Sequence, residues 1–140
     1  MASDKNIITV AATIAAPVEI VWQLFTEPEH ITQWNNASPE WHTPKAENDL
    51  RPEGRFTYTM AARDGSMSFD FSGTYTEVIE NKSIKYIIDD ERTVELIFED
   101  MDDTTIITEK FQPETTNPIE MQRIGWQAIL DNFKVYAEGQ

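Results

Sequence analysis

Apolar and polar residues alternate through the middle of the chain, and this period of two constrains the fold more than any other feature of the sequence. The alternating runs lie at residues 55–60, 69–76, 84–88 and 94–98. Polar segments suited to hairpin turns separate them. The pattern predicts an antiparallel meander with one apolar face. A last strand is predicted at about 104–111, but the adjacent Ile106 and Ile107 leave its inward face unassigned.

Helical signals precede this meander. β-branched residues predict a first strand over residues 7–14, and apolar residues at helical spacing predict a short helix over 18–25. Thr26 and Glu29 form a capping-box pattern, which predicts a second short helix at about 28–34.

A long helix is predicted from Asn117 to about residue 137. Asn117 is a favourable N-cap, Pro118 suits the first helical position, and Glu120 can return a side-chain bond to the cap. The apolar residues of this helix form two neighbouring stripes, one with Met121, Ile124, Ala128 and Ile129, the other with Trp126, Leu130, Phe133 and Ala137.

Consecutive strands exclude a doubly wound α/β fold, in which strands alternate with helices. The chain has 140 residues, of which 40% are hydrophobic, and this is enough for one domain over residues 1–140. We therefore predict an α+β fold. Two short helices follow the first strand, and a curved antiparallel sheet of about six to seven strands wraps around the long C-terminal helix.

The chain is strongly acidic, with 25 Asp and Glu against 11 Lys and Arg and a net charge of −14. This charge repels nucleic acid and anionic membrane surfaces, both of which bind through clustered cations. The sequence has no apolar run long enough to span a bilayer, and its N-terminus does not resemble a signal peptide. We expect a soluble, cytoplasmic protein that neither binds nucleic acid nor inserts into a membrane.

The polar residues form no catalytic or metal-binding pattern. The chain has no cysteine, and His30 and His42 lack a second histidine at metal-ligand spacing. The serines do not occur in a nucleophile-elbow pattern. The acidic runs at 89–91 and 99–103 lack the ligand spacing of a calcium loop and fall at expected turns. The sequence thus predicts no catalytic residue, no metal and no cofactor.

Five short strings, spread along the chain between residues 15 and 133, carry a resemblance. They are Ala-Ala-Pro-Val-Glu-Ile-Val-Trp at 15–22, Trp-Asn at 34–35, Trp-His-Thr-Pro-Lys-Ala-Glu-Asn-Asp-Leu-Arg-Pro-Glu-Gly-Arg-Phe at 41–56, Phe-Asp-Phe-Ser-Gly-Thr-Tyr at 69–75 and Gly-Trp-Gln-Ala-Ile-Leu-Asp-Asn-Phe at 125–133. In this order they resemble the family of activators of the ninety-kilodalton heat-shock protein ATPase, within the START-like or helix-grip superfamily. Where this chain has Glu53, the family usually has glycine, and a positive φ there would strain the glutamate backbone.

The resemblance implies a helix-grip fold with a cavity between the sheet and the long helix, which in the superfamily commonly holds a lipid, sterol, hormone or aromatic polyketide. The predicted ligand-binding residues are Trp34, Phe56, Tyr58, Phe69, Phe71, Tyr75, Tyr86, Phe98, Trp126, Leu130 and Phe133. We expect the three tyrosine hydroxyls to orient the polar end of the ligand. The leading hypothesis is non-enzymatic binding of a small hydrophobic or aromatic molecule. The plainer interpretation is that the aromatic residues simply fill a core.

Two further functions stay open. One is a chaperone-associated module that binds the heat-shock protein and stimulates its ATPase, although the eukaryotic co-chaperones resemble this chain only in their C-terminal domain. The other is an enzyme similar to polyketide cyclases, which requires an acid or base that faces the cavity. The candidate carboxylates are expected only on the polar side of the strands, which counts against this enzyme: Asp70, Glu77, Glu95 and Glu109.

Overall fold

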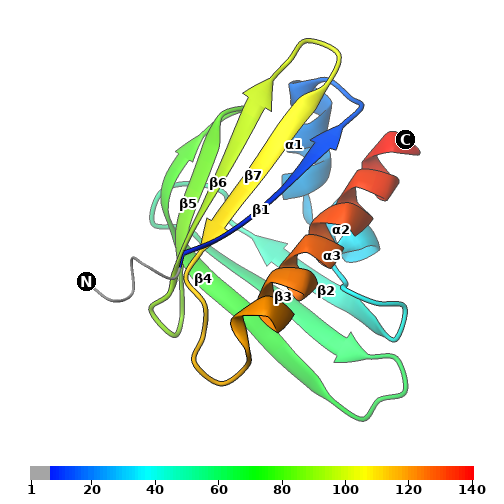
Figure 1. The fold of residues 1–140 in the computed structure, drawn as a ribbon, viewed down its shortest axis with the longest axis vertical. Coiled ribbons are helices and arrows are strands. Elements are labelled where there is room, and N and C mark those ends of the chain that lie inside the picture. The colour runs from blue at the N-terminus through cyan, green and yellow to red at the C-terminus, as the bar shows by residue number, and fades with distance from the viewer. Residues whose placement is uncertain (1–6) are drawn as a thin grey trace.

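The computed structural model describes residues 7–140, which form a seven-stranded antiparallel sheet and three helices (Figure 1). The strands are β1 (Ile8–Ile14), β2 (Trp41–Asn48), β3 (Arg55–Ala62), β4 (Ser68–Ile79), β5 (Ser83–Ile88), β6 (Thr93–Asp100) and β7 (Thr105–Phe111). The helices are α1 (Val18–Thr26), α2 (Pro28–Trp34) and α3 (Ile119–Glu138). The strand order is β1-β7-β6-β5-β4-β3-β2. The predicted element order and the predicted helix-grip fold are confirmed.

The sheet bends so strongly that β1, β7, β6 and β5 form one wall and β4, β3 and β2 form the other (Figure 1). A register shift between Tyr75 and Glu77 interrupts the pairing of β4 with β5, and such irregularities increase local bending. Helix α3 lies in the opening between the two walls, where it packs on β1 at one edge and on the short helices (Figure 1).

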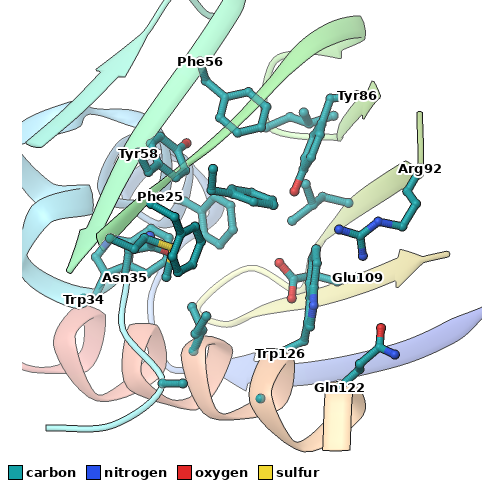
Figure 2. Close-up of a pocket in the computed structure, with 18 of the residues that line it drawn as sticks. Phe25, Trp34, Asn35, Phe56, Tyr58, Tyr86, Arg92, Glu109, Gln122 and Trp126 are labelled. Atoms are coloured by element: carbon teal, nitrogen blue, oxygen red, sulfur yellow. The ribbon is translucent and has the colours of Figure 1, made fainter. Parts of the chain in front are cut away.

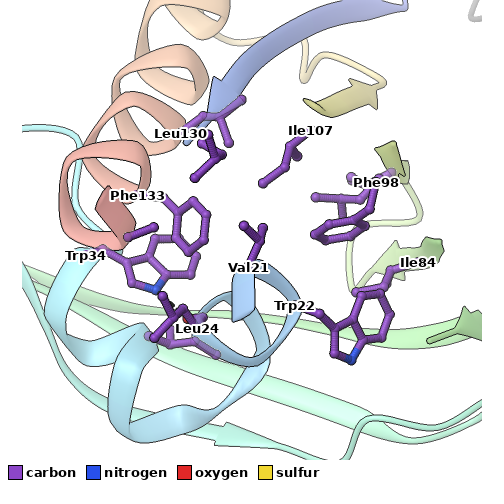
Figure 3. Packing of buried hydrophobic residues seen from close by; sticks show 14 of the residues in the cluster. Val21, Trp22, Leu24, Trp34, Ile84, Phe98, Ile107, Leu130 and Phe133 are labelled. Carbon is purple, nitrogen blue, oxygen red and sulfur yellow. Dashed lines mark hydrogen bonds between the residues drawn. The ribbon is translucent and has the colours of Figure 1, made fainter. Parts of the chain in front are cut away.

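The core is densest where the C-terminal half of α3 meets the short helices. Leu130 and Phe133 are buried there, and Figure 3 shows both side chains pointing toward Val21. The Phe133 ring lies edge-on to the rings of Phe25 and Trp34, with centroids 5.0 and 4.9 Å apart. These contacts bury the side chains of the C-terminal half of α3 against the short helices.

The predicted capping box at the start of α2 is wrong. The Thr26 hydroxyl instead donates to the Trp22 carbonyl within α1, at 2.7 Å. Glu27 occupies the N-cap of α2 without a side-chain bond, and Pro28 takes the first helical position. Proline is tolerated at this position, because an N–H in the first turn of a helix has no hydrogen-bond partner within the helix.

The predicted start of α3 is also wrong by one residue. Pro118 is the N-cap, and it has no side-chain capping bond. The Asn117 side chain donates to the Glu114 carboxylate at 2.9 Å, while Glu120 pairs with Arg123. Asn117 therefore orders the loop that precedes the helix instead of capping the helix itself.

The two predicted apolar stripes of α3 differ in burial. The stripe with Trp126 and Phe133 faces the sheet, whereas Met121 and Ile124 are more than half exposed. In the described part of the chain neither α3 nor another helix combines the length and the apolarity needed to cross a membrane.

The loop before β3 contains the positive φ that the resemblance indicated. Glu53 has a φ of 71°, a region that favours glycine. The Glu53 N–H donates to the Tyr75 carbonyl at 2.8 Å, and the Tyr75 N–H donates to the Gly54 carbonyl at 2.9 Å. A Cβ on Gly54 would lie 2.1 Å from the Asp49 carbonyl oxygen, so that position requires glycine. The loop thereby holds β4 in place at the sheet bend.

Candidate functional site

A cavity of about 420 Å³ lies between the concave face of the sheet and the N-terminal half of α3. Its volume falls in the range of small-molecule sites. Figure 2 shows aromatic side chains from several elements arranged around it, among them Phe25, Trp34 and Phe56. Met121 lines the cavity and is 59% exposed, so the cavity reaches the surface beside the start of α3.

Most of the predicted ligand-binding residues lie around this cavity. The predicted residues that line the cavity are Trp34, Phe56, Tyr58, Phe69, Phe71, Tyr75, Tyr86 and Trp126. Their contact with a ligand remains a prediction.

Three of the predicted residues, Phe98, Leu130 and Phe133, do not line the cavity, and a role for them in ligand binding remains a prediction. They belong instead to the buried core cluster. Ile84 and Leu96, which were not among the predicted residues, also line the cavity. The sequence pattern could have identified both, because Ile84 and Leu96 occupy the inward-facing positions of the alternating runs at 84–88 and 94–98.

The cavity stays open because of two adjacent residues of α3. Gly125 faces it, and a Cβ built on Gly125 would meet no atom within 4 Å. The Trp126 ring stacks on Phe111, with centroids 3.9 Å apart and planes at 12°. Because this indole lies flat against β7 and Gly125 has no side chain, the space between helix and sheet is not filled.

Three tyrosine hydroxyls lie in the cavity wall. Burial raises the pKa of Tyr58, Tyr75 and Tyr86, so each hydroxyl keeps its proton at neutral pH. The Tyr75 hydroxyl donates to Asn48 Oδ1 at 2.6 Å. Asn48 in turn donates to the Thr26 carbonyl at 2.7 Å, so the polar group of Tyr75 is held by the protein.

Glu109 lies on the inner face of the sheet, which corrects the expectation that it lies on the polar side. Its side chain is 9% exposed, lines the cavity, and shares the buried face of β7 with Ile107 and Phe111. Its strand partners are Val10 of β1 and Leu96 of β6, both buried and apolar. Burial raises the pKa of Glu109 to about 8, so the carboxyl is mostly protonated at neutral pH.

Polar side chains border the cavity where the segment after β7 meets α3. The amide of Gln122 donates to the Glu114 and Asn117 carbonyls at 3.0 and 2.8 Å. Arg92, from the turn before β6, also lines the cavity, and its Nε donates to Asp90 at 2.8 Å. These bonds fix the rim of the cavity.

The histidines and the acidic turns lie elsewhere. His30 Nδ1 is 2.7 Å from the Tyr136 hydroxyl, and neither His30 nor His42 lines the cavity. Residues 89–91 and 99–103 fall at or beside the β5–β6 and β6–β7 turns, as expected. Within residues 7–140, His, Asp and Glu side chains form no group of three that could hold a metal ion.

The chain matches a known family over nearly its whole length. The family model described as "Activator of Hsp90 ATPase homolog 1-like protein" matches residues 15–138. The chain belongs to this family. At the level of the family, membership supports a module that binds a ligand or associates with Hsp90.

Solved structures agree with this assignment. The AHSA1-like protein from Aeromonas hydrophila is 41% identical with a TM-score of 0.89, over 95% of this chain and 92% of that one. A protein from Cytophaga hutchinsonii is 55% identical with a TM-score of 0.83, over 96% of this chain and 93% of that one. The Aha1 dimer from Colwellia psychrerythraea, 14% identical with a TM-score of 0.74 over 94% of this chain and 96% of that one, shares the fold alone. No curated protein matches the chain.

Proposed function

We propose that this protein binds a small, mostly apolar molecule between the sheet and α3 and releases it chemically unchanged. The observation that carries this proposal is the aromatic cavity of about 420 Å³ that the family fold leaves beside Gly125. A site of this size with few polar groups suits a ligand with fused or linked rings, or a short lipid chain.

Burial of the ligand supplies the affinity. About 300 Å² of apolar ligand surface removed from water would contribute roughly 7 kcal/mol before the costs of association. Much of the wall is already ordered by protein contacts, such as the stack of Trp126 on Phe111 and the hydrogen bond of Tyr75 to Asn48. Such preorganisation lowers the entropy that binding must overcome.

Binding without conversion is part of the proposal. Glu109 is an acid in the cavity, which the cyclase hypothesis requires and which the sequence analysis did not expect. Acid–base catalysis of a condensation needs a second group positioned to take or give a proton. The other carboxylate in the lining, Glu114, is engaged by Asn117 at the rim, and neither histidine reaches the cavity. The tyrosine hydroxyls in the wall keep their protons at neutral pH, because burial raises their pKa, and so none of them can take a proton. The test is to incubate the protein with a ligand that it binds, to recover the ligand and to measure its mass. A changed mass would contradict binding without conversion.

Gly125 offers the sharpest experiment on binding itself. Gly125→Leu places a large side chain into the empty space of the cavity. Gly125→Ala raises the helix propensity by a similar amount but reduces the cavity volume only slightly, so it is the matched control. We expect native mass spectrometry and thermal shift against lipids and aromatic polyketides to show binding by the wild type and Gly125→Ala, and at least tenfold weaker binding by Gly125→Leu. Equal binding by all three proteins would place the ligand outside this cavity.

A second candidate function is association with Hsp90. Family membership favours it, together with two exposed apolar side chains that neighbour each other on the first turns of α3, Met121 and Ile124. Partner proteins commonly cover such surfaces. The test is a pull-down and ATPase assay with the cognate chaperone. Ile124→Glu should abolish binding, whereas the exposed Val135→Glu on the far half of α3 serves as the control.

A further inference from the structure

The polar groups of the cavity differ in whether the protein satisfies them. Tyr75 is bonded to Asn48, and Asn35 donates to Thr43 at 3.1 Å. In contrast, the Glu109 carboxyl and the Tyr86 hydroxyl form no hydrogen bond with another group of residues 7–140, although each residue is only 9% exposed. Because no fully buried side-chain polar atom of these residues lacks a partner, the oxygen atoms of Glu109 and Tyr86 must be accessible, and both residues line the cavity. Buried polar groups usually have a partner, and a site that leaves two of them facing a cavity is suited to a polar atom of a ligand.

The two groups face the same part of the cavity. Figure 2 shows the Tyr86 hydroxyl and the Glu109 carboxyl at the same end of the cavity, and the Phe25 and Trp34 rings at the other end. Their electrostatic coupling, through which Glu109 contributes to the raised pKa of Tyr86, also indicates proximity. The cavity therefore has an apolar aromatic end and an end with two unpartnered polar groups.

Both groups are hydrogen-bond donors at neutral pH. Burial alone raises the pKa of Glu109 to about 8, so its carboxyl carries an O–H, and the Tyr86 hydroxyl remains protonated. The other titratable groups that face this space are Tyr58 of β3, Tyr75 of β4, Arg92 of the β5–β6 turn and Glu114 after β7. Arg92 is paired with Asp90, and the residues of α3 that line the cavity do not titrate.

We propose that Glu109 and Tyr86 together donate hydrogen bonds to one acceptor oxygen, a carbonyl or phenolic oxygen, of an uncharged aromatic ligand whose rings occupy the apolar end. This inference rests on the proposed function and adds the chemical class of the ligand. An anionic ligand is disfavoured by Glu114 at the rim and by the net charge of −14. A cationic ligand would require ionisation of Glu109 among the buried side chains of Val10 and Leu96.

A pair of fluorescent probes tests the inference. The neutral naphthalene ketone prodan presents one carbonyl oxygen, and its analogue with propyl in place of propionyl has the same rings without that oxygen. At about pH 6, where Glu109 is protonated, we expect the wild-type protein to bind the ketone about tenfold more tightly than the analogue. The emission of bound prodan should lie at longer wavelength than in an apolar solvent, because its carbonyl accepts hydrogen bonds.

Variants distinguish the loss of either hydrogen-bond donor from a general effect on the fold. Glu109→Leu and Tyr86→Phe should each reduce the preference for the ketone by about threefold or more, and Glu109→Leu should shift the emission to shorter wavelength. Glu109→Gln keeps an N–H donor and should retain the preference. Glu95→Gln, on the outward face of β6 opposite Lys110, is the control and should match the wild type.

The pH dependence gives a readout that a merely structural role would not produce. Above about pH 8 the wild-type protein should lose the ketone preference, because Glu109 becomes a carboxylate that repels the acceptor oxygen, whereas Glu109→Gln should keep it. Equal affinity for both probes in every protein, or a ketone preference unchanged in Glu109→Leu, would overturn the inference and leave cavity binding intact. Absence of binding by either probe would overturn the proposed function as well.

Discussion

The two halves of α3 meet the sheet in different ways. In the C-terminal half, which we call the filled end, Leu130 and Phe133 are almost fully buried in the core cluster. In the N-terminal half, the open end, Gly125 has no side chain, Trp126 lies flat on Phe111, and a cavity of about 420 Å³ remains. One helix on one sheet thus gives both a solid core and a hollow. The size and orientation of a few side chains decide which, because packing depends on volume and the apolar pattern is similar at both ends.

The largest effect should come from truncation at the filled end. Phe133→Ala should lower the free energy of unfolding by about 3–5 kcal/mol, since the ring is fully buried and its neighbours cannot collapse into the space. Phe71→Ala at the open end should cost only about 1–2 kcal/mol, because the ring is partly exposed and already borders empty volume. Urea denaturation measures both, and equal losses would erase the distinction between the ends.

The next effect concerns the acid at the open end. Folded Glu109 keeps its proton up to about pH 8, whereas the unfolded chain releases it near 4.5. The contribution of Glu109 to the free energy of unfolding therefore falls as pH rises through this window, and it is constant below and above it. Relative to the wild type, Glu109→Gln should be more stable by about 4 kcal/mol at about pH 8 and should show little difference at about pH 4.

The outward-facing Glu95→Gln is the control for this pH experiment. Its difference from the wild type should stay within about 0.5 kcal/mol across the same window. If Glu109→Gln also showed no pH-dependent gain, Glu109 would be ionised in the folded protein and the open end would be wetter than we infer.

A smaller effect distinguishes two glycines. Gly125→Ala should stabilise the protein by about 1 kcal/mol, because alanine favours the helix and its Cβ meets no atom within 4 Å. Gly54→Ala should destabilise it, because the Cβ would lie 2.1 Å from the Asp49 carbonyl oxygen. Thermal denaturation of both variants checks the contrast. A destabilised Gly125→Ala would mean that the open end is filled in solution.

The smallest effect lies in the loop that holds the cavity wall. Glu53→Gly should stabilise the protein by about 0.5–1 kcal/mol, since glycine adopts the φ of 71° without strain. Glu53→Ala removes the same charge but keeps a Cβ, and it should give little or no gain. Equal stabilisation by the two variants would assign the effect to charge and not to the backbone.

The fold could be predicted because its signals are local and repeated. Alternation over residues 55–60 and 84–88 defined strands, and the switch to helical spacing after Asn117 defined α3. The details that failed depend on single side-chain choices. Asn117 bonds to Glu114 in its own loop, so a good capping residue did not become the cap.

The candidate site was only partly predictable for a different reason. Phe133 and Trp126 are both aromatic and lie on the same stripe of α3, two turns apart. Nevertheless Phe133 fills the core, whereas Trp126 borders the cavity. Which outcome occurs depends on how the side chains are oriented, as in the stack of Trp126 on Phe111, and no sequence pattern encodes that orientation. Glu109 was missed because Ile106 and Ile107 obscured the phase of β7, although alternate positions counted back from Phe111 reach it.

A crystal of the protein under xenon pressure tests most directly whether the open end is hollow. Xenon enters apolar cavities without polar recognition, so its binding reports empty volume independently of ligand identity. We predict xenon density beside Gly125, enclosed by Trp126, Phe71 and Tyr86, and none among Val21, Leu130 and Phe133. Side chains that occupy the space beside Gly125, with no xenon at that end, would contradict the account.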